Sequence, residues 1–276
     1  MSAPKVTDLE WQTDTLASAS STNQNVEGDD ATNDAAVPTV RLGNYCEIPD
    51  KTIQVSGTLE AIKKAGRNSE LAYQMTKRSK EIKRDMETSI LQNKARSAGT
   101  SSTARVTAGM GAWITTNVNN AGGSGNNPPG DGTAARTDGT QRAFTEAQLK
   151  NVLQQCWEEG AEPKMLMVGA FNKGVASGFP GIATKTKEVD DKRTVATVDV
   201  YVSDFSTLRI VPNRFQRARD AWVVDPEYAE LAYLRPFKVQ DLAKTGDSMR
   251  KQMLAEFALV VKNEKAHGLI ADLTTS

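Results

Sequence analysis

The chain has 276 residues, of which 38% are hydrophobic, so it holds enough apolar material for one large globular domain or two modest ones. Lysine plus arginine and aspartate plus glutamate both number 34, and this balance argues against a global electrostatic attraction to nucleic acid or membrane. Because the sequence has no apolar run of about 18 residues and begins with polar and acidic residues, we expect no membrane association and no signal peptide.

Residues 1–39 are polar and acidic, and we predict that they form a flexible N-terminal arm. Lys5 is the one lysine in this stretch, whereas the acidic residues are Asp8, Glu10, Asp14, Glu27, Asp29, Asp30 and Asp34. A segment with so few large apolar side chains cannot bury enough surface to offset the entropy of ordering it. Two interpretations stay open: plain disorder, and an arm that becomes ordered on a partner.

Residues 40–68 have the pattern of extended strands joined by turns. Apolar residues alternate with polar ones, and Gly43, Pro49 and Gly57 interrupt the alternation. From Ser69 the period changes, and Leu71, Met75, Ile82, Met86 and Ile90 fall on one face of a helix that we predict for residues 69–94. The other faces of this helix carry charges of both signs, which fits either a solvated surface or charged neighbours on several sides.

The next segment, residues 97–143, is rich in glycine, serine, threonine and asparagine. It contains neither a phosphate-binding G-x-x-x-x-G-K-[ST] loop nor the third glycine of a dinucleotide turn. We therefore predict a long mobile surface loop, with the glycine-rich stretch 122–139 at its centre, and no nucleotide site.

An α/β unit is predicted to follow in residues 145–215. Thr145 is the expected cap of a helix that ends at Gly160, and the apolar face comprises Leu149, Val152, Leu153, Cys156 and Trp157. A buried strand in "KMLMVGA", a short helix in "FNKGVASGF" and two antiparallel strands within 193–215 complete this unit. In residues 216–276 we predict further strands at 222–224, 229–236 and 253–261.

The inventory of chemical groups gives no basis for catalysis or for a cofactor. His267 has no second histidine or cysteine near it in sequence, so neither a zinc site nor a catalytic triad is indicated. Cys46 and Cys156 have no spacing signature, and two buried free thiols fit better than one disulfide. We expect no metal site and no enzyme, although an α/β enzyme with an unrecognised site stays as an alternative.

The densest basic cluster outside the predicted helix is "RFQRARD", with Arg214, Arg217 and Arg219. Arginine side chains of this kind hold phosphates or pair with carboxylates of another subunit. The cluster has no interleaved aromatic residues, so it indicates nonspecific contact and not sequence-specific DNA recognition.

Four blocks of the sequence, in this order, carry a resemblance to a known family. They are "RLGNYCEIPDKTIQVSGTLEAIKKAGRNSELAYQMTKRSKEIKRDMETSIL", "AGMGAWITTN", "TEAQLKNVLQQCWEEGAEPKMLMVGAFNKGVASGF" and "VVDPEYAELAYLRPFKVQDLAKTGDSMRKQMLAEFALVVKNEKAHGLI". Together they resemble the major capsid proteins of tailed bacteriophages, specifically the SU10-like family, over residues 40–272. The acidic N-terminal segment and the "GGSGNNPPGDG" loop depart from the family pattern.

The resemblance implies an α+β fold of the HK97 type, with an N-terminal arm, an extended β loop, a peripheral domain and an axial domain. Applied to this chain, it makes residues 1–39 the arm and 40–68 the extended loop. Residues 69–144 become the peripheral domain with a spine helix at 69–94, residues 145–215 the axial domain, and residues 216–276 the strands that complete the peripheral domain.

The function that the resemblance implies is self-assembly into the pentamers and hexamers of an icosahedral head that encloses double-stranded DNA. Further candidate partners are scaffolding, portal and decoration proteins, with packaged DNA held by nonspecific contacts. The expected location is the virion, and the host cytoplasm during assembly. A cellular compartment shell with the same fold is the alternative. The candidate interface residues are Ile53, Val55, Gly57, Arg67, Arg84, Glu87, Arg214, Arg217 and Arg219.

Overall fold

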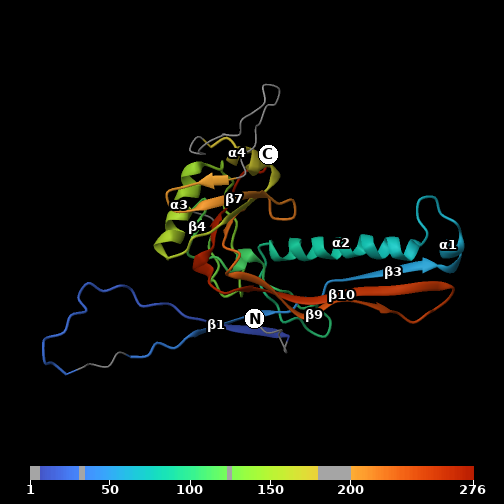
Figure 1. Cartoon of the computed structure of the whole chain (residues 1–276), viewed down its shortest axis with the longest axis horizontal. Coiled ribbons are helices and arrows are strands. Elements are labelled where there is room, and N and C mark those ends of the chain that lie inside the picture. The colour runs from blue at the N-terminus through green and yellow to red at the C-terminus, as the bar shows by residue number, and fades with distance from the viewer. Residues whose placement is uncertain (1–6, 31–34, 123–125, 180–199) are drawn as a thin grey trace.

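The computed structural model describes residues 7–30, 35–122, 126–179 and 200–276, and it divides them among three β-sheets (Figure 1). A six-stranded sheet and its helices form one lobe, from which an elongated three-stranded sheet and a separate two-stranded hairpin extend. The predicted strands at 193–215 lie only partly within the described residues, because Val195 and Val198 fall outside them.

The six-stranded sheet has the order β4-β11-β8-β5-β7-β6. Its strands are β4 (Val118–Asn119), β5 (Met165–Val168), β6 (Val200–Val202), β7 (Thr207–Pro212), β8 (Ala221–Val224) and β11 (Gly268–Ile270). The pairs β4–β11 and β5–β7 are parallel, and the other three pairs are antiparallel. Two helices belong to this lobe, α3 (Glu146–Glu158) and α4 (Ala170–Ala176), and α3 buries its apolar face in the same core as the sheet.

The start and the end of α3 are those that the sequence predicts. The Thr145 hydroxyl accepts a hydrogen bond from the backbone of Gln148, whose side chain in turn accepts one from the backbone of Thr145. Gly160 ends the helix with a φ of 82°, which favours glycine. Trp157, however, is 54% exposed, and its ring contacts that of Phe205 at the surface of the core. The prediction that Trp157 faces the core is therefore wrong. The buried stripe on α3 ends one residue earlier, at Cys156.

The elongated part of the molecule is the sheet β3-β10-β9 with one long helix on it. Its strands are β3 (Asp50–Ser56), β9 (Ala229–Asp241) and β10 (Ser248–Val261), all antiparallel, and α2 (Glu70–Ile90) runs along them in Figure 1. A short helix, α1 (Gly57–Ala61), turns the chain at the far end of the sheet. The predicted periodicity of α2 is confirmed, because Ile82 and Met86 are buried in a cluster that Leu71 and Met75 adjoin.

α2 ends earlier than predicted, at Ile90 instead of residue 94. Leu91 leaves the helical conformation, and the side chain of Asn93 then bonds to the backbone of Arg136 in both directions, at 2.6 and 2.8 Å. Two short 3₁₀ helices, η1 (Met110–Ala112) and η2 (Glu264–Ala266), lie in the connecting segments.

The predicted N-terminal arm is in part a strand. β1 (Asp8–Thr13) pairs antiparallel with β2 (Val40–Tyr45), from Asp8 opposite Tyr45 to Thr13 opposite Val40. Leu9 and Trp11 are buried, and the Trp11 ring lies 5.3 Å from that of Trp113. The described part of residues 14–39 forms the loop of this hairpin and projects away from the rest of the chain in Figure 1. A boundary at residue 39 therefore separates two paired strands.

The predicted division of the remaining segments also differs from the sheets. Residues 40–68 contribute β2 to the hairpin and β3 to the elongated sheet. Residues 216–276 supply β9 and β10 to the elongated sheet, but β8 and β11 belong to the six-stranded sheet. Strands adjacent in sequence therefore join different sheets, and local periodicity gives no sign of this.

Candidate functional site

Two of the predicted interface residues are buried inside the chain. Ile53 and Val55 are 4% and 3% exposed, and they point from β3 toward α2 in the cluster that holds Ile82 and Met86. Both side chains therefore contribute to the core of the elongated sheet, and their role at a subunit interface stays a prediction.

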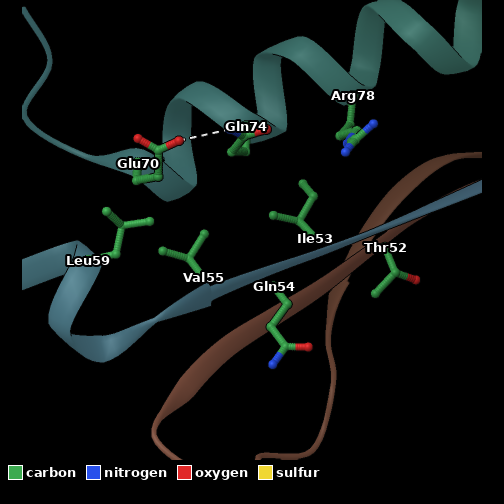
Figure 2. A pocket seen from close by; sticks show the side chains of 8 residues that line it. All are labelled: Thr52, Ile53, Gln54, Val55, Leu59, Glu70, Gln74 and Arg78. Carbon is green, nitrogen blue, oxygen red and sulfur yellow. Dashed lines mark hydrogen bonds between the residues drawn. The ribbon is translucent and has the colours of Figure 1, made fainter.

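The N-terminal end of α2 is held by a small group of polar contacts, next to a shallow pocket that Figure 2 shows. Glu70 is buried there and accepts a hydrogen bond from Gln74 at 2.8 Å. Arg67 reaches the same carboxylate at 2.7 Å, and its guanidinium lies 4.4 Å from the centre of the Tyr73 ring. Arg67 thus stays at the surface, but its charge already has a partner within the chain.

Gly57 has a steric role at this end of the sheet. A Cβ atom at this position would lie 2.3 Å from a carboxylate oxygen of Asp247, and the Gly57 N–H donates to the Asp247 backbone carbonyl at 3.1 Å. Glycine therefore allows the turn between β9 and β10 to lie close to the start of α1.

Arg84 and Glu87 connect α2 to the segment after β7. The Arg84 guanidinium lies 5.2 Å from the centre of the Phe215 ring, and Glu87 accepts a hydrogen bond from Asn213 at 2.7 Å. Arg214, between these two partners, is exposed. These contacts join the elongated sheet to the six-stranded lobe within one chain.

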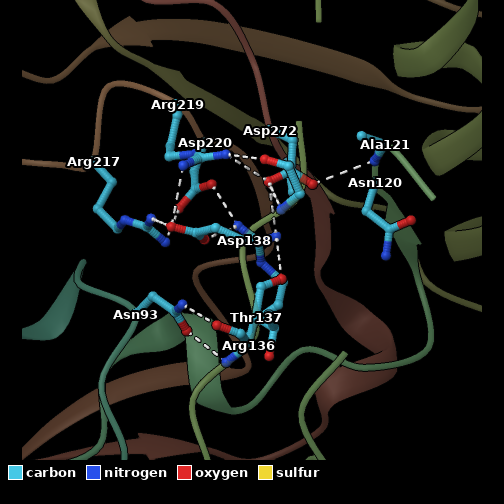
Figure 3. A network of polar contacts seen from close by, with 12 residues as sticks. Asn93, Asn120, Ala121, Arg136, Thr137, Asp138, Arg217, Arg219, Asp220 and Asp272 are labelled. Atoms are coloured by element: carbon cyan, nitrogen blue, oxygen red, sulfur yellow. Dashed lines mark hydrogen bonds and ion pairs between the residues drawn. The ribbon is translucent and has the colours of Figure 1, made fainter. Parts of the chain in front are cut away.

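The main charged cluster of the chain is a network of three arginines and three aspartates (Figure 3). Its members, called the arginine–aspartate network below, are Arg136, Asp138, Arg217, Arg219, Asp220 and Asp272. The Arg136 side chain is fully buried at its centre, 3.1 Å from an oxygen of Asp138, 3.1 Å from one of Asp220 and 3.2 Å from one of Asp272. Three positive and three negative side chains balance one another.

Arg217 and Arg219 have their partners inside this network. Arg217 pairs with Asp138 and Asp220, and Arg219 pairs with Asp138 and Asp272. These two arginines therefore pair within their own chain, and the prediction that they hold a neighbour's carboxylates or packaged DNA stays a prediction. Sequence analysis missed Arg136 and its partners. The available signal was that Asp220 directly precedes the apolar strand β8 and that Asp272 follows β11 two residues after its end.

The network anchors the glycine-rich segment to the six-stranded lobe and to the end of α2. Asp272 has a φ of 62° and accepts hydrogen bonds from the backbone of Gly139 at 2.8 Å and of Ala121 at 3.3 Å. Arg136 also bonds to Asn93 just beyond α2. This end of the predicted mobile loop is consequently held in place, and residues 123–125 of the loop lie outside the described residues.

The two innermost carboxyl groups have opposite pKa shifts, although burial acts in the same direction on both. Burial raises the pKa of Asp220 to about 6, against the opposing effect of Arg217 and Arg136. Burial would also raise the pKa of Asp272, but hydrogen bonds from the Gly139 and Ala121 backbone, together with Arg136, hold that pKa below its usual value.

Asp220 should make the chain more stable as the pH falls from about 7 to about 5. Its folded pKa, about 6, exceeds the ordinary value of 3.8, so the folded chain takes up the proton first. This contribution is complete below the unfolded pKa and is lost as the pH rises through about 6. We expect Asp220→Asn to remove this slope in urea unfolding measured across that range. Asp29→Asn, at an exposed loop position, should keep it, and an unchanged slope in Asp220→Asn would refute the assignment.

The remaining titratable groups do not form a recognisable reaction centre. Among the described residues, no group of three or more His, Cys, Asp and Glu side chains could hold a metal ion. His267 is buried, its Nδ1 accepts from the Asp225 backbone, and burial lowers its pKa to about 4. Cys46 and Cys156 are both buried free thiols. No helix in the described ranges is long and apolar enough to cross a membrane.

Large apolar side chains are instead exposed on the parts that project. In the hairpin, Leu16 is 99% exposed, Val37 80% and Val26 76%. At the far end of the elongated sheet, Leu59, Ile62 and Tyr73 are also exposed.

This arrangement of a compact lobe, an elongated helix-on-sheet and a projecting hairpin is the HK97-type fold of capsid shells. The chain resembles the capsid of the cyanophage A-1(L) with a TM-score of 0.66 and 10% identity, covering 99% of this chain and 90% of that one. It resembles a structure of Microbacterium phage Oxtober96 with a TM-score of 0.62 and 12% identity, over 98% and 87%. An encapsulin of Synechococcus elongatus shares the fold with a TM-score of 0.55 and 8% identity, over 86% and 79%.

Sequence comparison matches the chain to major capsid proteins of phages. The chain matches the SU10 major capsid protein family over residues 3–274. It is 27% identical over 304 residues to the major capsid protein of Escherichia phage Phieco32, covering 96% of this chain and 85% of that protein. The chain therefore belongs to the SU10 major capsid protein family, and the resemblance stated from the sequence is confirmed.

Proposed function

We propose that this major capsid protein assembles with itself into pentamers and hexamers, and that these form the icosahedral head around the double-stranded DNA of a tailed phage. The observation that carries the proposal, beyond family membership, is the set of apolar side chains on the projecting hairpin. Leu16 and Val37 are almost fully exposed in the single chain, and a neighbouring subunit would cover them.

The three sheets suggest how the roles are divided. The six-stranded lobe, with most of residues 145–215 plus β8 and β11, would be the axial domain at the centre of a capsomer. The elongated sheet with α2 would be the peripheral domain. The hairpin β1–β2, and not residues 40–68, would be the extended loop that lies over the next subunit, because the described part of its loop, residues 14–30 and 35–39, projects from the rest of the chain in Figure 1.

Assembly of this kind depends on repetition of modest contacts. Each interface needs only about 800 Å² per partner, because a closed shell engages many of them at once. Rotational symmetry within a capsomer requires that one surface of the subunit meets a different surface of its neighbour. Scaffolding, portal and decoration proteins are further candidate partners. The protein would act in the virion, after assembly in the host cytoplasm, and as a structural protein without catalytic activity.

Sedimentation and negative-stain electron microscopy of the purified full-length chain test the proposal. We expect closed shells, tubes or capsomer rings, either from the protein alone or after co-expression with a scaffolding protein from the same genome. A uniform monomer under both conditions would contradict self-assembly. Shells that load an enzyme and exclude DNA would favour the compartment alternative, whose fold is shared.

A further inference from the structure

The side of α2 that faces away from the sheet carries a line of positive charge. Lys77, Lys80 and Arg84 recur at intervals of three and four residues, so they lie along one side of the helix, and Lys83 adjoins them. All four side chains are exposed. The buried residues Ile82 and Met86 lie on the opposite side, against the elongated sheet. The segment after β7 contacts this side at its C-terminal end, where Arg84 lies beside Phe215 and Glu87 accepts from Asn213.

The acidic residues of α2 offset this line only in part, because three of the four pair with other cations, while Glu87, whose partner Asn213 is uncharged, stays negative beside Lys83 and Arg84. Glu70 pairs with Arg67, Glu81 with Arg78 and Asp85 with Lys51, while Glu87 accepts from Asn213. The four cations have no hydrogen bond or ion pair to any residue that the structure describes. Lys83 and Arg84 contact only the rings of Phe237 and Phe215, at 5.9 and 5.2 Å. The face is therefore positive although the helix contains both signs.

The chemistry of this face suits a polymer of closely spaced negative charges. Lys77 and Arg84 are separated by about 10 Å along the helix axis, at 1.5 Å per residue. Double-stranded DNA presents one phosphate charge per about 1.7 Å of its axis, and lysine side chains neutralise such charges without reading the sequence.

We infer that the outer face of α2, through Lys77, Lys80, Lys83 and Arg84, is the surface by which the capsid protein contacts packaged double-stranded DNA. Arg217 and Arg219, by contrast, already have carboxylate partners inside the arginine–aspartate network. The inference rests on the proposed function, because it requires that α2 faces the interior of the shell.

The test is the salt dependence of binding between the unassembled full-length chain and a fluorescent DNA duplex of random sequence. The variant K77Q/K80Q/K83Q removes three charges from the face, and K63Q/K238Q/K244Q removes three exposed charges from the far end of the elongated part. Each phosphate contact contributes about 0.9 to the slope of log affinity on log salt, so the first variant should lose about 2 to 3 units of slope. Between about 50 and 200 mM salt, its affinity should fall about 40-fold less than that of the wild type.

The control variant should keep the wild-type slope. Equal slopes in the two variants, or no measurable binding by the wild type, would overturn the inference. Electron microscopy of wild-type particles reports on the proposed function separately, because it detects shells whether or not the unassembled chain binds DNA. A K77Q/K80Q/K83Q variant that keeps its DNA slope but fails to form shells would assign the face to an acidic protein partner and would also overturn the inference.

Discussion

Arg136→Leu is expected to lower the free energy of unfolding by about 3–5 kcal/mol, the largest effect of any single substitution proposed for this chain. The Arg136 side chain is fully buried and lies 3.1 Å from Asp220 and 3.2 Å from Asp272. Its removal would take one of two counter-charges from each of two buried carboxylates, which keep only Arg217 and Arg219, and a buried carboxylate is costly to keep ionised away from water. Urea unfolding of the unassembled subunit at neutral pH measures the change.

A matched control for this substitution is Arg214→Leu. Arg214 is exposed in the same part of the molecule as Arg217 and Arg219, and we expect its replacement to change the stability by less than about 0.5 kcal/mol. Similar changes in unfolding free energy for the two variants would mean that the arginine–aspartate network does not join the six-stranded lobe to the segment beyond α2. A change of about 1 kcal/mol or less for Arg136→Leu would lead to the same conclusion.

Removal of the hairpin loop is expected to abolish shell formation while leaving the subunit folded. Thr13 and Val40 face each other at the end of the β1–β2 ladder, so an Asn-Gly turn can replace residues 14–39 and keep the register. The described loop residues are exposed, apart from the ends of the hairpin, and their loss should affect folding little. Circular dichroism and urea unfolding would report on the fold, and sedimentation on assembly.

A variant of unchanged length shows whether the apolar side chains of the loop are responsible. Leu16→Ser, Val26→Ser and Val37→Ser together remove the three most exposed apolar groups of the loop. We expect this triple variant to unfold like the wild type and to assemble poorly. Normal shells from the deletion variant would show that the loop is dispensable, and the proposed role of the hairpin would then fail.

The parts of the fold that sequence analysis anticipated depend on local patterns. The apolar face of α2 repeats with the helical period, and Thr145, Gln148 and Gly160 mark the two ends of α3 by their own hydrogen bonds and backbone conformation. Each of these signals lies within one element. Their physical cause acts over a few residues, so the order of residues is sufficient to reveal it.

The parts that were missed depend on contacts between distant segments. β1 pairs with β2 across a loop of more than twenty residues, and its two buried side chains, Leu9 and Trp11, stand in an otherwise acidic and polar stretch. Arg136 meets Asp220 and Asp272 only after the six-stranded sheet has brought the three segments together. Charge pattern alone could not distinguish the buried Arg136 from the exposed cations of α2.

A cryo-electron microscopy reconstruction of the particles formed by the full-length chain tests the central claim most directly. We predict a closed shell in which residues 14–39 of each subunit are covered by the adjacent subunit, with the arginine–aspartate network intact inside each chain. A shell whose hairpins point freely into solvent, or particles held together by Arg217 and Arg219 across the subunit boundary, would contradict it.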